Sequence, residues 1–316
     1  MCGIAHRIGF IHGAIELALP KQFDGGSRNL PGVVPGIGTD AGGPHQRQPA
    51  GNPAPQNALR DVHAQFAYDG LQDLQRSLAD QHALADQHHQ VAQRLRCQVF
   101  ADEMGARLDT KIPGHDVDLF DNFCEHLLVR DEVTREVVGT YRLLTPAQAT
   151  RVGSTYSDLE FDLTRLRSLR ERMVELGRSC VHADYRTGGV IMALWGALAE
   201  FMVRNKLDTM IGCASIPMLH NGIVSGDIAA SIWHQLHKTH LAPIEHHVRP
   251  RLPLPVEKLD CSLTVEPPAL IKGYLRLGAK VLGAPAWDPD FNTADLPILM
   301  RINDLPARYR KHFLGA

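Results

Sequence analysis

The chain has 316 residues, of which 44% are hydrophobic and 22% are charged, and these are ordinary values for a globular protein. A net charge of −2 and an aromatic share of 6% argue against a nucleic-acid binder, which usually carries a basic excess and stacking side chains. Six cysteines without a CxxC pair indicate free thiols in a reducing compartment. No apolar run reaches the roughly 18 residues of a membrane span. We therefore expect a cytoplasmic protein, with peripheral contact to the inner face of the membrane left open.

The first 68 residues differ in composition from the rest of the chain. Residues 25–55 are dense in Gly, Pro, Asn and Gln, and such a stretch buries too little apolar surface to offset the entropy lost on ordering. We predict a disordered extension over residues 1–68, either a native tail or the product of a misplaced start, and one folded domain over 69–316. Cys2 stands where class II glutamine amidotransferases have their nucleophile, but low-complexity sequence follows it, so we interpret this likeness as chance.

The folded part begins with segments of alternating type. A weak strand pattern covers residues 71–78, and apolar residues at helical spacing predict a helix over 86–104. Two β-rich runs, 125–130 and 136–144, flank a short charged turn. This arrangement predicts an antiparallel hairpin.

The second half of the chain contains a recognisable supersecondary unit. A strand pattern over 173–181, a Gly-Gly turn, a helix pattern over 190–205 and a buried strand over 209–214 predict a parallel β-α-β unit. The fold class is therefore α+β, with a mixed central sheet flanked by helices on both faces. Later segments predict helices over 226–237, 268–277 and 306–313, and a strand over 296–302.

Charged residues recur inside segments that otherwise look buried. Glu175 and Arg178 lie within a strand pattern, where charge is costly unless it is paired or used. Because strand side chains alternate between faces, Glu175, Gly177 and Ser179 should share one face. Leu176 and Arg178 should point to the other. Three acids and three bases could lie together in the fold: Arg96, Asp118, Asp121, Arg142, Glu175 and Arg178. They would form either salt bridges that tie the predicted helix to the sheet or a polar pocket for a zwitterionic substrate.

Two further groups of residues have alternative interpretations. Gly188 and Gly189 precede a predicted helix and follow Arg186, which fits either an ordinary turn or phosphate binding at a helix N-terminus. Six histidines occur in two groups, the first beside a polar loop and the second at helical spacing without acidic or cysteine company, so we interpret them as solvated or helix-surface residues and predict no metal site. They are His82, His88, His89, His234, His237 and His240.

The order of these charged residues resembles that of the acyl-homoserine-lactone synthases, which have the GNAT fold. Arg96 with Phe100, Asp118 with Asp121, Arg142, and Glu175-x-x-Arg178 follow in the same order. A closer resemblance, to the ornithine N-acyltransferases, covers about residues 71–313. The segments that carry it are 175–189, 211–215, 274–279, 290–293 and 308–310.

This resemblance implies a GNAT-like fold, and transfer of a 3-hydroxyacyl chain from acyl carrier protein to the α-amine of L-ornithine, giving lyso-ornithine lipid. Glu175 and Arg178 would be catalytic, with Glu175 as general base, and no bound cofactor is implied. The acceptor would be bound by Arg96, Phe100, Asp118, Asp121 and Arg142. The phosphopantetheine thioester of the donor would lie along Val181, His182, Arg186, Thr187, Gly188 and Gly189.

Gly189 is followed by Val190 and Ile191, whereas the usual GNAT phosphate loop has a further Gly or Ala. This departure favours a carrier-protein donor over coenzyme A. Acyl carrier protein is acidic, so we expect a basic docking surface, unless the basic residues are simply solvated. The candidates are Arg165, Arg167, Arg170, Arg172, Arg308, Arg310 and Lys311. Two other functions stay open: synthesis of an N-acyl amino acid or acyl-homoserine-lactone signal, and non-enzymatic, haemolysin-like binding of lipid or membrane.

Overall fold

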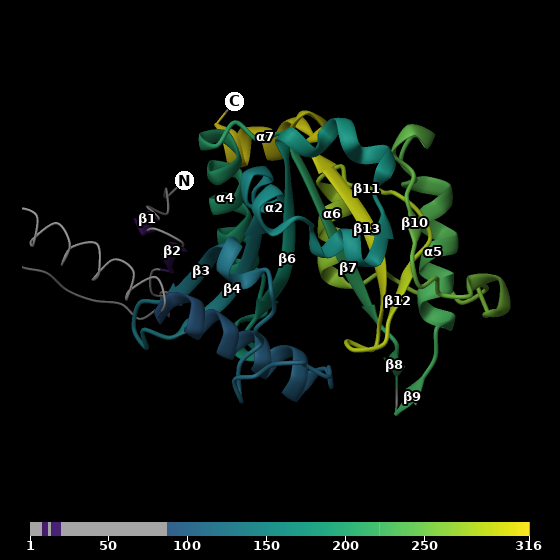
Figure 1. Ribbon diagram of the computed structural model, residues 1–316, viewed down its shortest axis with the longest axis horizontal. Helices are drawn as coiled ribbons and strands as arrows, with labels where there is room; N and C mark the ends of the chain where they lie inside the picture. Colours follow the sequence, from purple (N-terminus) through teal and green to yellow (C-terminus); the bar gives the residue numbers. More distant parts are fainter. Residues whose placement is uncertain (1–7, 12–13, 20–86, 221, 316) are drawn as a thin grey trace, which may run out of the picture. The chain divides into compact units, whose positions relative to one another are not determined.

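The computed structural model describes residues 8–11, 14–19, 87–220 and 222–315 (Figure 1). The predicted strand 71–78 and the predicted domain boundary after residue 68 lie outside these residues. Within the predicted disordered extension, Ile8–Ile11 and Ala14–Leu19 instead form strands β1 and β2. The reason is that β2 pairs in parallel with β3, whose open edge offers unpaired backbone groups.

A nine-stranded sheet forms the centre of the fold, in the order β1-β2-β3-β4-β6-β7-β13-β11, with β12 paired to β13. The β2–β3 and β6–β7 pairs are parallel, and the other pairs in this sheet are antiparallel. Its remaining strands are β3 (Glu125–Asp131), β4 (Val137–Leu144), β6 (Met173–Val181), β7 (Thr209–Pro217), β11 (Lys280–Val281), β12 (Ala286–Asp288) and β13 (Thr293–Arg301). Two small sheets pair β5 (Phe161–Asp162) with β10 (Arg249–Pro250) and β8 (Leu219–His220) with β9 (Ile223–Val224).

Helices connect these strands and follow the predicted order. Residues 87–97 form a helix that continues into a π-helical turn at Gln98–Glu103. The α-helices are α2 (Pro146–Val152), α3 (Tyr156–Glu160), α4 (Gly189–Arg204), α5 (Asp227–Thr239), α6 (Ala269–Arg276) and α7 (Ala307–Leu314). The 3₁₀ segments are Asp121–Phe123, Thr164–Arg172, Ala183–Tyr185, Ile244–His246, Val256–Lys258 and Ile302–Asp304.

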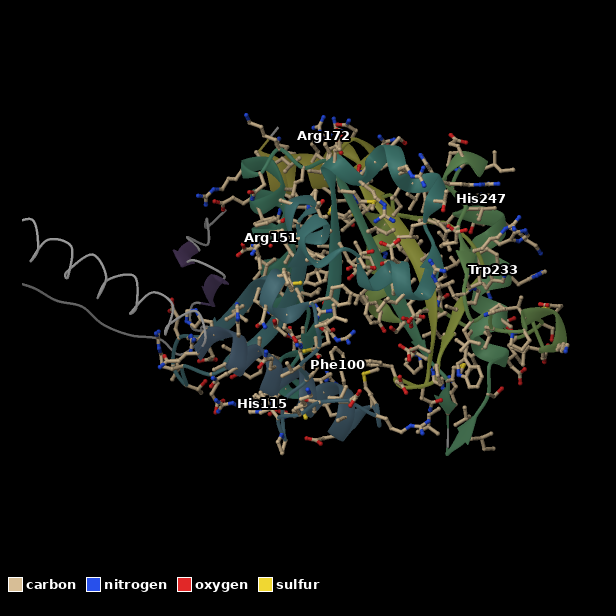
Figure 2. The ribbon with its side chains drawn as sticks, viewed as in Figure 1. Phe100, His115, Arg151, Arg172, Trp233 and His247 are labelled. Atoms are coloured by element: carbon tan, nitrogen blue, oxygen red, sulfur yellow. The ribbon has the colours of Figure 1, made fainter. Side chains whose placement is uncertain are left out.

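Helices cover both faces of the sheet, and side chains fill the layers between them (Figure 2). On one face, Leu143 and Leu176 pack with Leu194 of α4. On the other, Leu128 packs with Leu95 of helix 87–97. This two-sided burial follows from the alternation of apolar side chains along the strands, and it confirms the predicted mixed sheet with helices on both faces.

The predicted hairpin and the predicted β-α-β unit are both confirmed. β3 and β4 pair antiparallel, β6 has the predicted bounds, and α4 joins β6 to its parallel neighbour β7. Of the helices in the described residues, none has the length and apolar character needed to cross a membrane.

The central sheet divides between β6 and β7. The two strands pair only from Met173 with Thr209 to Glu175 with Ile211, and β7 then follows β13 along its whole length. Gly212 lies at the point of division, where a Cβ atom would come within 2.5 Å of the Leu176 carbonyl oxygen. The chain therefore needs glycine here for the strands to approach closely before they separate.

Candidate active site

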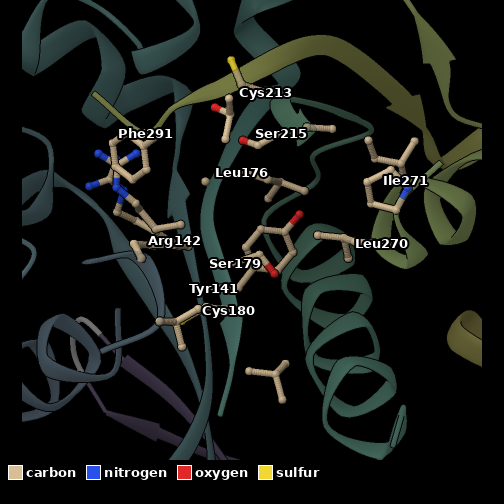
Figure 3. Close-up of a pocket in the computed structure, with 18 of the residues that line it drawn as sticks. Tyr141, Arg142, Leu176, Ser179, Cys180, Cys213, Ser215, Leu270, Ile271 and Phe291 are labelled. Carbon is tan, nitrogen blue, oxygen red and sulfur yellow. The ribbon is translucent and has the colours of Figure 1, made fainter. Parts of the chain in front are cut away.

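A cavity of about 580 Å³ opens at the split between β6 and β7 (Figure 3). Its walls include the diverging part of β6, the end of β7, and residues from both faces of the sheet. Figure 3 shows Leu270 and Ile271 on the opposite side of the cavity from Arg142 and Phe291. The cavity thus joins an apolar region on the α4 and α6 side to a charged region on the other side.

The apolar region, here called the apolar arm, is formed mainly by aliphatic and aromatic side chains. The Tyr141 hydroxyl lies 2.7 Å from that of Tyr274, which links β4 to α6 across the arm. A surface of this kind suits a hydrocarbon chain, because burying the chain there removes apolar area from water. The lining residues of the apolar arm are Tyr141, Leu176, Ile191, Trp195, Leu270, Ile271 and Tyr274.

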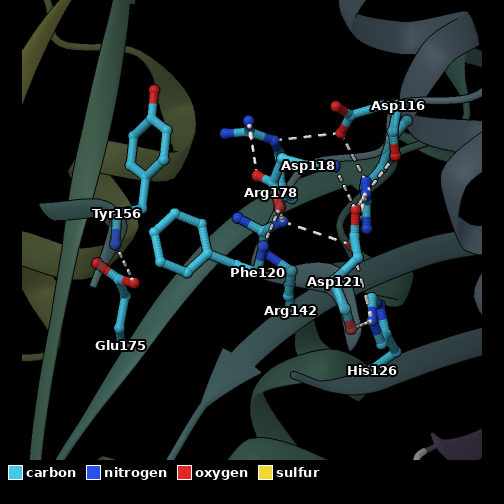
Figure 4. A network of polar contacts seen from close by, with 10 residues as sticks. Asp116, Asp118, Phe120, Asp121, His126, Arg142, Tyr156, Glu175 and Arg178 are labelled. Carbon is cyan, nitrogen blue, oxygen red and sulfur yellow. Dashed lines mark hydrogen bonds and ion pairs between the residues drawn. The ribbon is translucent and has the colours of Figure 1, made fainter. Parts of the chain in front are cut away.

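Behind the charged wall lies a closed ring of ion pairs, shown in Figure 4. Arg96 is fully buried, and its guanidinium donates to the carboxylates of Asp116 at 2.7 Å and Asp121 at 2.8 and 2.9 Å. Such pairs tie helix 87–97 to the loop before β3. The complete set, here called the aspartate–arginine ring, is Arg96, Asp116, Arg178, Asp118, Arg142 and Asp121.

The ring is closed by the two arginines of the sheet. Arg178 lies 3.1 Å from Asp116 and 3.2 Å from Asp118. Arg142 lies 2.7 Å from Asp118 and 3.4 Å from Asp121. Burial alone would raise the pKa of Asp118, but Arg142 and Arg178 hold it below its ordinary value. The carboxylate is therefore charged, as an ion pair requires.

The ring corrects the composition of the predicted network. The third acid of the network is Asp116, whereas the sequence predicted Glu175. Arg96, Asp118 and Asp121 do not line the cavity, whereas Arg142 does. For Arg96, Asp118 and Asp121 the structure favours the salt-bridge interpretation over direct contact with a substrate, because these groups already bind one another.

Glu175 has a different environment from the one predicted. Its carboxylate accepts the backbone N–H groups of Tyr156 at 2.8 Å and Ser157 at 2.6 Å, in the first turn of α3. Burial raises its pKa, and the hydrogen bonds from Ser157 and Tyr156 oppose this rise. Glu175 lines the cavity and thus faces any molecule within it.

Arg178 lies on the same face of β6 as Glu175, so the predicted alternation of faces is wrong at this point. The register with β4 shifts between Thr140 and Arg142, and the φ angle of Arg178 is +51°. A β-bulge of this kind inserts one residue and reverses the facing of those after it. Arg178 then stacks over the rings of Tyr156 at 4.9 Å and Phe291 at 4.6 Å.

Across the split from Arg178 lies a second set of acids, here called the acidic corner: Asp288, Asp295 and Glu160. Asp288 and Asp295 line the cavity and are almost completely buried. Asp288 accepts from the Tyr156 hydroxyl at 3.0 Å, and Asp295 from the Thr293 hydroxyl at 2.9 Å. Among the described residues, none of the three forms an ion pair with Lys, Arg or His.

The pKa values of two of these acids are raised, as expected for buried carboxylates without an ion-pair partner. Burial, and then the neighbouring Asp288, raise the pKa of Asp295 to about 6, although Arg178 and nearby hydroxyl groups oppose the rise. Burial, and then Asp295 and Asp288, raise the pKa of Glu160 to about 7. Keeping these carboxylates ionised at neutral pH therefore destabilises the fold.

We expect Asp295→Asn to raise the free energy of unfolding at pH 8. A pKa raised from 3.8 to about 6 means that the folded chain holds this proton more tightly, so ionisation costs up to about 3 kcal/mol above pH 6. The gain should shrink as the pH falls through 6 to 5. Urea unfolding at pH 8 and pH 5 measures it, with exposed Asp109→Asn as control. Unchanged or lower stability at pH 8 would contradict the prediction.

The predicted donor segment only partly borders the cavity. Val181, Arg186 and Gly188 line it, whereas His182, Thr187 and Gly189 do not. Gly188 has a φ angle of +100° at the N-cap of α4, a conformation that favours glycine. The Arg186 guanidinium donates to the Val181 carbonyl at 3.0 Å and to Glu103 at 2.6 Å.

Phe100, predicted to bind the acceptor, also lines the cavity, and its ring meets that of Phe291 edge-on at 5.7 Å. Three cysteines line the cavity as well. Burial raises the pKa of Cys124 and of Cys180 to about 12, and that of Cys213 well above its ordinary value. These thiols stay protonated at neutral pH and are poor nucleophiles.

Comparison with known proteins agrees with this architecture. A family model described as an acetyltransferase (GNAT) domain matches residues 95–196. The chain is 34% identical over 239 residues to the L-ornithine N(alpha)-acyltransferase of Brucella abortus, covering 71% of this chain and 84% of that relative. It is 36% identical over 242 residues to the protein of the same name from Rhodobacter capsulatus, covering 72% and 91%.

Among solved structures, the chain is similar to a CoA-dependent acyl-homoserine lactone synthase, BjaI, at 15% identity and a TM-score of 0.43, over 74% of this chain and 83% of that one. The identity to the sequence relatives is far higher and extends over most of their length. The chain, which has a GNAT domain, therefore belongs to the L-ornithine N(alpha)-acyltransferase family.

Proposed function

We propose that the protein transfers a 3-hydroxyacyl chain from acyl carrier protein to the α-amine of L-ornithine and so produces lyso-ornithine lipid. The observation that carries this proposal is the cavity through the split sheet, which joins the apolar arm to a charged region. An acyl chain fits the first and an amino acid the second, so the thioester and the amine would meet at the split. The relatives' name supports ornithine as the acceptor.

The reaction would proceed by direct transfer. The α-amine loses a proton and attacks the thioester carbonyl; a C–N bond forms, the C–S bond breaks, and the pantetheine thiolate leaves and is protonated. Glu175 would accept the amine's proton, directly or through one water. Backbone N–H groups of β6 near Val181, beyond its last pairing with β7, would stabilise the oxyanion. Because Cys124, Cys180 and Cys213 are held as thiols, an acyl-cysteine intermediate is disfavoured.

The phosphopantetheine of the donor would lie along the segment from Val181 to Gly188. The N-terminus of α4, a helix of 16 residues, begins after Gly188 and favours a phosphate. Ile191 stands where the usual GNAT phosphate loop has a further Gly or Ala, which supports a carrier-protein donor.

Docking of acyl carrier protein would use basic side chains that have no acidic partner. Arg170 binds Asp158 with both terminal nitrogens, and Arg172 lies 3.1 Å from Asp208, so both are partly neutralised (Figure 2 labels Arg172). Arg167 is exposed. Of the predicted basic residues in the 3₁₀ segment Thr164–Arg172, we therefore favour Arg167 as a contact.

The assay uses the full chain with L-ornithine and either 3-hydroxyacyl carrier protein or the matching coenzyme A thioester. We expect lyso-ornithine lipid by mass spectrometry, stoichiometric release of the carrier-protein thiol, and slower turnover with coenzyme A. Acylation of another amine in place of ornithine, or formation of acyl-homoserine lactone from S-adenosylmethionine, would overturn the acceptor assignment. Absence of any acyl transfer would overturn the whole proposal.

A further inference from the structure

The acids of the acidic corner differ from the buried aspartates of the aspartate–arginine ring. Asp116, Asp118 and Asp121 each bind two arginines, so the aspartate–arginine ring is electrically balanced within itself. Arg178 partly offsets the charge of Asp295, but this arginine is already paired with Asp116 and Asp118. Buried carboxylates that open onto a cavity without a partner cation are costly, unless a ligand supplies that cation.

We propose that Asp288 and Asp295, which line the cavity, bind the side-chain ammonium of the acceptor and thereby select a dibasic amino acid, while Glu160 adds negative charge nearby. This assignment rests on the proposed function, because it places a second charged group of the same acceptor. Asp295 is the central residue, since it lines the cavity and is only 3% exposed.

The opposite wall of the cavity supports this orientation. Arg142 and Arg178 line the cavity there. Their hydrogen bonds to the ring use the Nη1 atom of Arg142 and the Nε and Nη2 atoms of Arg178. Arginine suits carboxylate binding, so the acceptor's carboxylate would face these two residues. The side-chain ammonium would then extend toward the acidic corner, with the α-amine between them at the split.

A metal ion is a poor alternative occupant of the corner. Within the residues that the structure describes, no three His, Cys, Asp or Glu side chains are placed to hold a metal. One carboxylate oxygen of Asp288 accepts hydrogen bonds from the backbone N–H groups of Asp290 and Phe291, and the other accepts from the Tyr156 hydroxyl. These bonds fix the orientation of the carboxylate. The corner is thus arranged to accept hydrogen bonds, as an ammonium group requires.

The test compares L-ornithine with L-norvaline, which has the same carbon chain without the terminal ammonium. We expect the unmodified protein to prefer ornithine, in kcat/KM, by roughly 100-fold or more. In Asp295→Asn that preference should fall roughly tenfold to 100-fold, since a hydrogen-bonded charge pair is lost. Asp288→Asn and Glu160→Gln should lower it in the same direction, and exposed Asp109→Asn should not change it.

Calorimetric titration of each amino acid into the full chain adds a readout that does not need turnover. Ornithine should bind more tightly than norvaline, and Asp295→Asn should reduce the difference. An unchanged preference in all three corner variants would overturn the proposal, as would equal binding of the two amino acids by the unmodified protein. Lack of acyl transfer with intact selective binding would instead count against the proposed function alone.

Discussion

Replacing Glu175 with glutamine is expected to slow acyl transfer about 100- to 10,000-fold in single turnover, which is the usual contribution of a general base. Glutamine keeps the size of the side chain but cannot take the proton of the attacking amine. The measurement mixes enzyme loaded with acyl donor and saturating ornithine, and follows the first turnover by rapid quench. A folded variant that keeps the normal rate would remove Glu175 as the base.

Glu175 also has a structural task that the experiment must separate from catalysis. Its two oxygens accept hydrogen bonds from the backbone N–H groups of Tyr156 and Ser157. Glutamine would turn its NH2 group toward one of these two N–H groups, which lowers the stability of the fold by about 1–3 kcal/mol. Thr155→Ala is the matched control, because Thr155 is the N-cap of α3 and its loss costs about 1 kcal/mol without altering the carboxyl. If both variants lose the same rate, Glu175 acts by holding α3 and the base assignment is wrong.

Much of the fold could be predicted from local patterns. β6 has the predicted bounds, and the hairpin, α4 and the parallel partner of β6 all lie where periodicity placed them. Each of these elements buries at least one apolar face, which gives the sequence a clear period. β2 lacked such a signal, because its place depends on the free edge of β3 rather than on its own composition.

The position of Arg178 shows where periodicity fails. Strict alternation places it opposite Glu175, but a bulge in β6 brings both side chains to one face. A bulge inserts one residue through a local change of φ, and an arginine at positive φ leaves no mark in a hydrophobicity pattern. The same irregularity brings Arg178 within reach of Asp116 and Asp118.

The acidic corner was missed for a related reason. Glu160 ends α3, while Asp288 and Asp295 lie on β12 and β13, more than a hundred residues later. No motif spacing joins such positions. The available sequence signal is an acid within an otherwise buried strand, and it applies to Asp295 as it does to Glu175.

Replacing Arg96 with methionine is expected to lower the free energy of unfolding by about 3–5 kcal/mol, as for other buried ion pairs that lose one partner. Arg96 is fully buried, and its removal would leave Asp116 and Asp121 with one arginine each and no access to water. Methionine fills much of the same volume, so the loss comes from charge rather than from a large cavity. Urea unfolding near pH 7.5 measures it.

Arg94→Met provides the control, because Arg94 lies exposed on the same helix and its replacement should change stability by less than about 0.5 kcal/mol. The ring also holds Arg142 and Arg178 in the cavity wall, so Arg96→Met should raise the KM for ornithine even at temperatures where the variant stays folded. Stability and KM both equal to those of Arg94→Met would show that the ring neither stabilises the fold nor positions the two arginines that face the acceptor.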